Sequence, residues 1–362
     1  MTTRQQLDHQ TLERILQAND VEAIAFSELL RLFREEEAMS GFLPDGTYQV
    51  DPRNRDRVLY NASRARRPHD NHPLSNVLGN ARECAICRGD TTGVVDVVGL
   101  SEGFTFINKN LFPALFPLDP DQGRPVRGLH FLQWTSSLHD RDWHNLPPSD
   151  QSVVMGRLAA LERKLLVDSA GFMPETEAGQ RGFVSIIKNY GRLVGGSLAH
   201  GHQQITLGNV MPRRVEDHVR FQKERGESFS AYLWRENPAE LTVADYGPAR
   251  LVVPYFMKRP YDMMLLLRDM AKKHLYKLNE AELAAVSRGW HDATRAIHHL
   301  LPAIGRQVAY NAVTHNGPGA GLYFEFLPYT QEDGGLEKLG LYVCQQQPTT
   351  AAAHIDQFLR ET

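Results

Sequence analysis

The sequence has little cysteine, with three in 362 residues. Three cysteines cannot build a disulfide framework, which excludes a small secreted scaffold held together by disulfides. Long hydrophobic runs are missing as well. The densest apolar run, Met263 to Leu267, is five residues long, whereas a membrane-spanning helix needs roughly 20. We therefore expect no association with a membrane.

An excess of charge of one sign is also absent. The chain carries 40 Lys and Arg against 43 Asp and Glu, a net charge of −3, so no overall field attracts nucleic acid. The first residues, MTTRQQLDHQ, lack the apolar core of a secretory signal. We expect a cytoplasmic protein that does not bind nucleic acid. With 42% hydrophobic and 23% charged residues, the composition is that of an ordinary folded protein.

Apolar periodicity divides the chain into three parts. Residues 5–39 have helical spacing, and the Pro- and Gly-containing stretch 41–48 ends that pattern. Strands are then expected at 94–100, 104–107, 129–134, 183–189 and 200–207, with a helix over 150–168 and a charged, helical segment over 211–237. The order repeats with strands at 250–256, 261–268, 308–315 and 321–326 around a helix at about 279–299.

This repetition predicts a duplicated α+β unit. Because most strand-to-strand connections are short, the sheets should be antiparallel and flanked by helices. We expect a helical N-terminal extension at 1–45, a first domain at 46–237 and a second at 238–362.

One segment, KNYGRLVGGSLAHGHQQ at 188–204, carries the clearest chemical signal. On a strand, His200, His202 and Gln204 project from one face, and three polar side chains there each need a partner. The preceding turn of Gly195, Gly196 and Ser197 suits backbone N–H groups that approach an anion. A neutral imidazole is a nucleophile toward phosphorus. The pattern favours phosphoryl or nucleotidyl transfer through a covalent histidine over purely structural histidines.

Cys84 and Cys87 form a C-x-x-C pair. Two thiolates at this spacing bind one Zn²⁺, and a tetrahedral site needs two further ligands. Histidines are available at His130, His139, His144 and His200. A redox dithiol or ordinary free cysteines are the alternatives, and the nearby histidines favour a metal.

A basic stretch occupies residues 51–70, where six arginines and one acidic residue lie between Arg53 and Arg67. Such a run is commonly a solvated face. It also suits a phosphate clamp, because guanidinium groups bind phosphate oxygens in a bidentate manner.

Five collinear blocks make the chain resemble the galactose-1-phosphate uridylyltransferase family of the histidine-triad superfamily. The resemblance runs from about Tyr48 to Gly340. The blocks are RVLYNASRARRPHD (57–70), ECAIC (83–87), FINKNLFPAL (106–115), KNYGRLVGGSLAHGHQQI (188–205), and VVPYFMKRPYDMMLL (252–266) with YNAVTHNGP (310–318). The resemblance implies two tandem histidine-triad-like repeats, the second degenerate.

The resemblance also implies roles for individual residues. His202 would be the nucleophile, Gln204 would bind the transferred phosphoryl group, and Ser197 would contact the phosphates. The other implied substrate-binding residues are Arg64, Arg67, Phe106, Asn108 and Asn189, beside the glycine turn. The implied ligands of a structural zinc are Cys84, Cys87, His139 and His200.

The chain also departs from the family pattern. Gly201 stands where uridylyltransferases have proline, and Thr206 where they have tryptophan. In the second repeat, His218, His315 and Glu325 offer a possible second metal site, although Tyr323 replaces one of the expected histidines. The segment 334–343 is closer to the branch of phosphorylases that act on nucleoside-diphosphate sugars.

We therefore expect a nucleotidyltransferase that moves a nucleoside monophosphate from a nucleotide sugar to a phosphorylated acceptor, such as a hexose 1-phosphate. A phosphorylase that uses inorganic phosphate is one alternative, and a non-catalytic nucleotide-binding protein is another. The resemblance further implies a homodimer.

Overall fold

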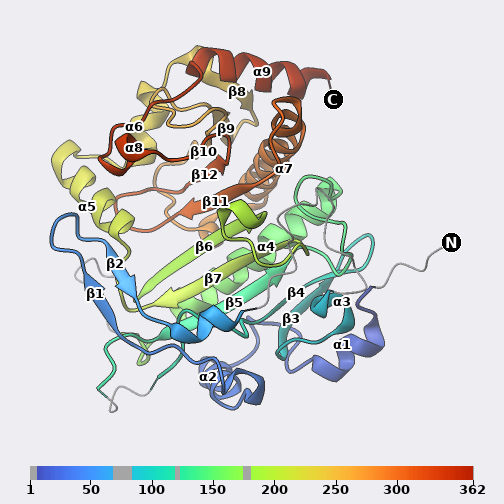
Figure 1. Cartoon of the computed structure of the whole chain (residues 1–362). Coiled ribbons are helices and arrows are strands. Elements are labelled where there is room, and N and C mark those ends of the chain that lie inside the picture. Colours follow the sequence, from blue (N-terminus) through green and yellow to red (C-terminus); the bar gives the residue numbers. More distant parts are fainter. Residues whose placement is uncertain (1–5, 68–83, 119–122, 174–180, 362) are drawn as a thin grey trace.

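A ten-stranded antiparallel sheet runs through the computed structural model of the chain (Figure 1). The structure describes residues 6–67, 84–118, 123–173 and 181–361. The strand order is β3-β4-β5-β7-β6-β11-β12-β10-β9-β8. The strands are β3 (Val94–Gly99), β4 (Phe104–Lys109), β5 (Gly128–Trp134), β6 (Phe183–Tyr190), β7 (His202–Gly208), β8 (Thr242–Asp245), β9 (Ala249–Val252), β10 (Met263–Leu267), β11 (Tyr310–His315) and β12 (Tyr323–Pro328).

Two long helices, α4 (Pro148–Val167) and α7 (Glu280–Ala303), cover one face of this sheet and pack against each other. Strand alternation supplies the apolar surface that they bury. Ile205 and Leu207 of β7 and Phe324 and Phe326 of β12 belong to the same buried core as Trp290 of α7. The opposite face carries polar side chains and two smaller apolar clusters. The expected α+β class with antiparallel strands flanked by helices is confirmed.

The two halves share one sheet, because β6 of the first half pairs with β11 of the second from Tyr190↔Tyr310 to Ile186↔Thr314. Each half contributes five consecutive strands. The expected boundary at residues 237–238 lies between α6 (Phe229–Glu236) and β8. The division into domains at that boundary stays a prediction.

The N-terminal segment is helical only in part. Within the expected helical range 5–39 it forms α1 (His9–Ile15), α2 (Phe26–Arg34) and a 3-10 turn at Glu37–Met39. Between them the chain is held by the sheet, since the backbone N–H groups of Gln17 and Ala18 donate to the carbonyl of Val94. These bonds to a strand edge lie between α1 and α2, so the expected helical segment is interrupted there.

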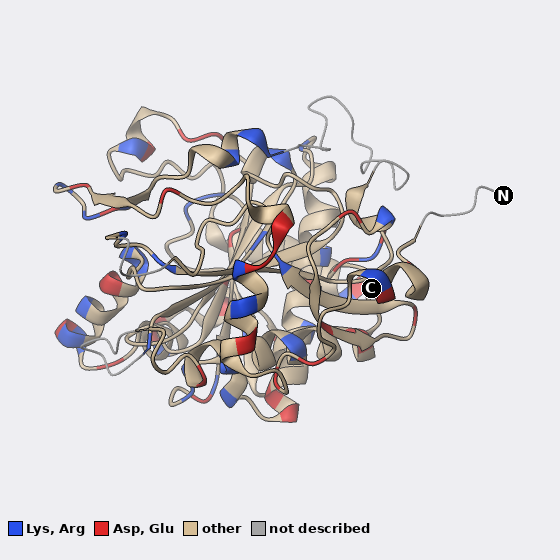
Figure 2. Cartoon of the chain, turned by 90° about the horizontal axis from the view of Figure 1, so that it is seen from below, with Lys and Arg blue, Asp and Glu red and all other residues tan. Residues whose placement is uncertain are grey.

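The other helices and a small hairpin surround the main sheet. The helices are α3 (Ala85–Arg88), α5 (Arg213–Arg225), α6, α8 (Gly335–Lys338) and α9 (Pro348–Glu361), and the hairpin pairs β1 (Tyr48–Val50) with β2 (Arg57–Leu59). Figure 2 shows Lys and Arg interspersed with Asp and Glu along the outer helices and loops. Among the described residues, no helix has the length and apolar character needed to cross a membrane.

Candidate active site

The strand β7 begins at His202, and this imidazole is held in one orientation. Its Nδ1 atom donates to the backbone carbonyl of His200 at 2.8 Å. A carbonyl can only accept, so the ring proton is on Nδ1 and the lone pair is on Nε2. Burial lowers the pKa of His202 to about 4. At neutral pH the side chain is therefore an uncharged nitrogen base that lines a cavity.

That cavity lies on the sheet face opposite α4, where β5 and β7 run beside α3 and the turn before β7. Four of the expected site residues line it together. The lining residues are Arg67, Ala85, Ile86, Asp90, Thr91, Asn110, Leu111, Phe112, Leu132, Trp134, Ser197, Leu198, His202 and Gln204. The structure thus brings the expected nucleophile, Gln204, Ser197 and one arginine to a single hollow.

The turn before β7 depends on glycine. Gly195 has a φ of +86°, a left-handed conformation that glycine adopts without strain. At Gly196 a Cβ atom would lie 2.7 Å from the carbonyl oxygen of Gly191, which is too close for any other residue. The buried Ser197, which follows this turn, lines the cavity, whereas Gly195 and Gly196 lie outside its described lining.

Gln204 is oriented by His130, a residue considered from the sequence only as a possible metal ligand. The backbone N–H of Ala114 donates to Nδ1 of His130 at 2.9 Å, so the proton of the neutral ring is on Nε2. This Nε2 lies 3.2 Å from Oε1 of Gln204. Burial lowers the pKa of His130 to about 3, which keeps the ring neutral. The amide NH₂ of Gln204 remains available to the cavity. The pairing of β5 with β7 brings His130 beside Gln204, and no sequence pattern indicated this contact.

The two expected arginines sit at the end of the 3-10 turn Ala62–Arg66. Nη1 of Arg64 donates to the carbonyl of Phe112 at 2.6 Å, and Arg67 lines the cavity. Burial lowers the pKa of Arg64 to about 10, and the neighbouring charge of Arg67 acts in the same direction. Both side chains remain cationic near neutral pH. Residues 68–70 of this motif and Glu83 of ECAIC lie outside the described residues.

Phe106 and Asn108 lie beneath the cavity and do not form its described lining. Both are fully buried in β4. Asn108 Oδ1 accepts from Trp134 Nε1 at 2.8 Å, and the Phe106 ring stacks on that indole. The cavity instead meets the next residues along the chain, Asn110, Leu111 and Phe112. Asn189 also lies outside the lining and accepts a hydrogen bond from Asn311 across the junction of β6 and β11.

Cys84, Cys87, His139 and His200 form the one described group of at least three His, Cys, Asp or Glu side chains whose ligand atoms lie within 4.8 Å of one another. Nδ1 of His200 is 3.7 Å from Cys84 Sγ and 3.6 Å from Cys87 Sγ. Nδ1 of His139 is 3.5 Å from Cys87 Sγ. A tetrahedral zinc with Zn–S of about 2.3 Å and Zn–N of about 2.0 Å separates such atoms by roughly 3.5 Å.

The surroundings of this cluster also suit a metal. Nε2 of His200 lies 2.8 Å from the carbonyl of Ser136, which directs the lone pair of Nδ1 toward the sulfurs. Hydrogen bonding from Cys87, against the opposing effect of burial, lowers the pKa of Cys84 to about 2. These four residues therefore fit a zinc ion, as expected. His200 itself precedes β7 rather than lying on it.

A buried ion pair supports the other side of β7, and no sequence pattern indicated it. Lys188 Nζ lies 2.7 Å from Asp142 Oδ2 and donates to the carbonyl of His202 at 3.1 Å. At Gly201 a Cβ atom would lie 2.5 Å from Cγ of Asp142. Glycine between the two histidines is thus what allows this carboxylate to pack against the backbone.

The residues considered for a second metal bind one another instead. His218 Nε2 lies 2.8 Å from the hydroxyl of Tyr323, and His315 Nε2 lies 2.6 Å from Glu325 Oε2. They do not form a further group with converging ligand atoms among the described residues. The geometry gives a second metal site no support.

The structure resembles solved proteins that share little sequence with it. A uridylyltransferase aligns with a TM-score of 0.67 at 19% identity, over 87% of this chain and 98% of that chain. An ADP-glucose phosphorylase from Arabidopsis thaliana, solved with bound ADP-glucose, aligns at 0.61 and 17% identity, over 86% and 98%. A GalT-like protein from the same plant aligns at 0.60 and 16% identity, over 86% and 98%. No protein-family model and no curated protein sequence matches the chain. The chain therefore has the fold of these uridylyltransferase, phosphorylase and GalT-like structures, which confirms the fold implied by the resemblance in its motifs.

Proposed function

We propose that this chain is a nucleotidyltransferase that forms a covalent nucleotidyl-histidine at His202. The observation that supports this most is the hydrogen bond from Nδ1 of His202 to the carbonyl of His200. It leaves an unprotonated Nε2 at a cavity that also holds Gln204, Ser197 and Arg67. A fixed neutral nucleophile beside donors for phosphoryl oxygens is the arrangement that this chemistry requires.

In the first step, Nε2 of His202 attacks the α-phosphorus of a nucleotide sugar. A P–N bond forms, the P–O bond to the leaving sugar phosphate breaks, and its electron pair stays on that phosphate. In the second step, a phosphate oxygen of the acceptor attacks the same phosphorus and the P–N bond breaks. The sugar phosphate leaves the first step as an anion, and in the second step the electron pair of the P–N bond returns to Nε2 of His202 as the neutral imidazole, so neither step needs a general acid.

The other residues act on charge and position. The amide NH₂ of Gln204 donates to a phosphoryl oxygen, while Arg67 balances the charge of the phosphates. The glycine turn brings the backbone close to them, and Ser197 adds a hydroxyl donor. Zinc on Cys84, Cys87, His139 and His200 would fix the carbonyl that orients the nucleophile.

The acceptor distinguishes two versions of the reaction. A transferase uses a hexose 1-phosphate, whereas a phosphorylase uses inorganic phosphate. The structural neighbours include a uridylyltransferase and an ADP-glucose phosphorylase. We therefore propose transfer as the general reaction and phosphorolysis as its nearest variant. A nucleotide-binding protein without catalysis is the remaining candidate.

A donor screen tests the proposal. UDP-, ADP-, GDP- and CDP-sugars and dinucleoside polyphosphates would be incubated with the protein, with inorganic phosphate or with glucose 1-phosphate. We expect one donor to be consumed only when an acceptor is present, and His202→Ala to abolish that consumption. Tight binding of a donor without turnover in any mixture would instead favour the binding protein.

We also propose that the protein is a homodimer. Apolar side chains are exposed along residues 336–343, where Leu339 is 78% and Leu341 62% exposed, and on the β1–β2 hairpin. Exposed apolar groups that cluster in this way commonly mark an interface. Light scattering coupled to size-exclusion chromatography should give twice the chain mass of 40.9 kDa.

A further inference from the structure

The strand order of the sheet is symmetric about the junction of β6 and β11. Moving outward from it, β6, β7, β5, β4 and β3 correspond to β11, β12, β10, β9 and β8. In each half, the helix between the matching strands, α4 or α7, covers the same face. The second half therefore has a position equivalent to that of the candidate active site.

Strand pairing identifies the equivalent residues. In the first half, β7 begins at His202, opposite Trp134 of β5, and Gln204 stands opposite Ile187 of β6. In the second half, β12 begins at Tyr323, opposite Leu266 of β10, and Glu325 stands opposite Val313 of β11. Tyr323 thus takes the place of His202, and Glu325 that of Gln204.

A cavity of about 500 Å³ lies at this equivalent position, in the size range of small-molecule sites. It is bounded by α5, α6, β10 and β12, which lie together at one end of the molecule in Figure 1. Its lining includes Tyr323 and Glu325 themselves, with Phe229, Phe256 and Met264 as apolar surface.

Two cationic side chains and one carboxyl oxygen of this cavity lack hydrogen-bond partners among the described residues. Arg214 makes no hydrogen bond or ion pair with the described residues, and Lys258 only lies over the ring of Tyr342, at 4.4 Å. Asp262 is 5% exposed, and its Oδ1 has no hydrogen-bond partner; the nearest cation is Arg259, at 3.9 Å. Desolvating a polar atom without giving it a partner is costly, so this carboxyl points to a missing donor.

Several of the remaining acidic and imidazole groups are paired within the protein, whereas Glu224 also lines the cavity and is exposed. Glu325 binds His315, His218 binds the Tyr323 hydroxyl, and Asp217 accepts from Arg213 and Arg220. With a phenol in place of the first-half imidazole, the cavity has no counterpart of the nucleophile. It is suited to binding rather than to group transfer.

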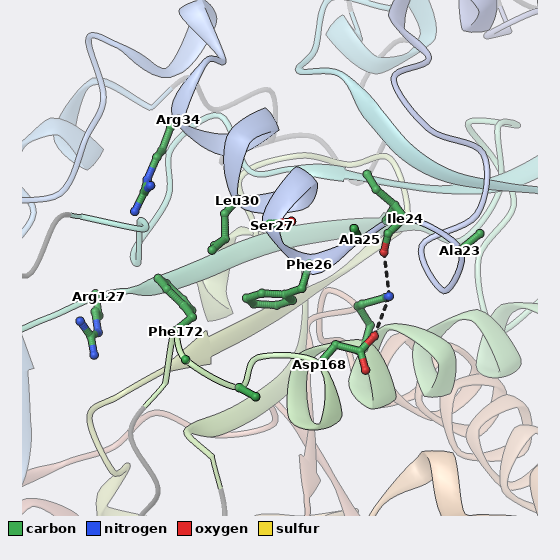
Figure 3. A pocket seen from close by; sticks show the side chains of 13 residues that line it. Ala23, Ile24, Ala25, Phe26, Ser27, Leu30, Arg34, Arg127, Asp168 and Phe172 are labelled. Atoms are coloured by element: carbon green, nitrogen blue, oxygen red, sulfur yellow. Dashed lines mark hydrogen bonds and ion pairs between the residues drawn. The ribbon is translucent and has the colours of Figure 1, made fainter.

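A different hollow, between α2 and the end of α4, is less informative (Figure 3). Lys164 there already donates to the carbonyl of Ile24 and pairs with Asp168, and Arg34 donates to the carbonyl of Pro117. Because two of its three cations are engaged within the protein, it does not indicate a ligand.

We propose that the second-half cavity is a separate, non-covalent binding site for a phosphate ester of a sugar or nucleoside. Arg214 and Lys258 would bind the phosphate, Asp262 would accept a hydrogen bond from a ligand hydroxyl, and the aromatic side chains would contact the ring. This site does not depend on the proposed covalent chemistry at His202.

Calorimetric titration of the full chain tests the site, with glucose 1-phosphate, AMP and inorganic phosphate as separate probes. We expect at least one ester to bind at two sites per chain. The double variant Arg214→Ser/Lys258→Ser should keep one site and weaken the other at least about tenfold, because it removes two charge-assisted contacts. A charge-matched control, Lys223→Ser/Lys273→Ser, changes exposed lysines outside the cavity and should keep both sites.

The proposal would be overturned if no ester bound the unaltered chain, or if every ester site of the unaltered chain kept its affinity in Arg214→Ser/Lys258→Ser. Equal affinity for inorganic phosphate and for the esters would also contradict the proposal, since Asp262 would then accept no hydrogen bond from a sugar or nucleoside hydroxyl. His202→Ala should retain the second site even where it abolishes turnover. Failure of the proposed reaction at His202 is therefore distinguishable from failure of the proposed second binding site.

Discussion

Nδ1 of His202 lies 2.8 Å from the carbonyl oxygen of His200, and His200 also points its own Nδ1 at the two cysteine sulfurs. The residue that fits a zinc ligand is therefore the same residue whose backbone fixes the proton of the proposed nucleophile. A change in the metal cluster should alter both the stability of the protein and its reaction.

Removing one zinc ligand tests this coupling. Cys84→Ser should lower the zinc content from about one per chain toward zero, because a four-ligand site loses a thiolate. It should also lower the melting temperature and kcat, since bound metal contributes folding free energy. Metal analysis by mass spectrometry, calorimetry and steady-state kinetics measure these effects.

Cys344→Ser is the matched control, because Cys344 lies outside the metal-ligand cluster. It should leave zinc content, melting temperature and kcat unchanged. If complete removal of zinc by a chelator did not change the melting temperature, the structural role of the metal would be wrong.

Lys188→Met tests the buried ion pair behind β7. The substitution leaves the carboxylate of Asp142 buried without its cation, and breaking such a pair costs about 3–5 kcal/mol. Lys188→Met/Asp142→Asn removes both charges and should cost less than the two single changes together. Urea denaturation of all three variants measures the difference, and strict additivity would show that the two charges are not coupled.

Gln204→Leu should lower kcat roughly 10²- to 10³-fold, as loss of one preorganised donor to a phosphoryl oxygen does. KM should change less, because that bond strengthens as charge develops in the transition state. Thr206→Val, the next residue on the same face of β7, lies outside the cavity lining and serves as the control. Equal losses in both variants would indicate damage to the strand rather than loss of a donor.

The stability of the protein should depend on pH through Asp262. Burial raises the pKa of Asp262 to about 7, with Glu325 acting in the same direction and Arg259 opposing it. Burial also raises the pKa of the nearby Cys344 thiol. An unfolded aspartate has a pKa near 3.9. Between about pH 4 and 7 the folded chain binds a proton that the unfolded chain has lost, so stability falls as pH rises through this window.

Asp262→Asn removes this titration. Its stability relative to the unaltered chain should rise by roughly 2–3 kcal/mol between pH 5 and pH 8, at about 1.4 kcal/mol per pKa unit. Urea denaturation at the two pH values measures the change. Parallel pH profiles for both chains would contradict the raised pKa.

The local elements could be predicted from the sequence because apolar spacing determines them. The alternation of Ile205 and Leu207 with polar neighbours, for example, gives both the strand β7 and its buried face. The three-residue strands β1 and β2 carry no such alternation, since their side chains are half-buried or exposed. Residues 16–25 have helical spacing, yet the backbone N–H groups of Gln17 and Ala18 donate to Val94, a contact that spacing cannot reveal.

The candidate site was predictable where one segment carries several of its residues, as Ser197, His202 and Gln204 do. The contributions of His130 and Lys188 depend on which strands pair, so a single sequence cannot show them. The same holds for the second-half cavity, because Tyr323 and Glu325 become equivalents of His202 and Gln204 only through the sheet register.

Intact-protein mass spectrometry tests the central claim most directly. The protein would be incubated with the donor that it consumes, without acceptor, and the adduct located by peptide mapping under alkaline conditions that preserve a P–N bond. We predict one nucleoside monophosphate per chain, bound at His202, absent from His202→Ala and released when acceptor is added. An adduct on another residue, or turnover with no adduct at any time, would contradict the covalent mechanism.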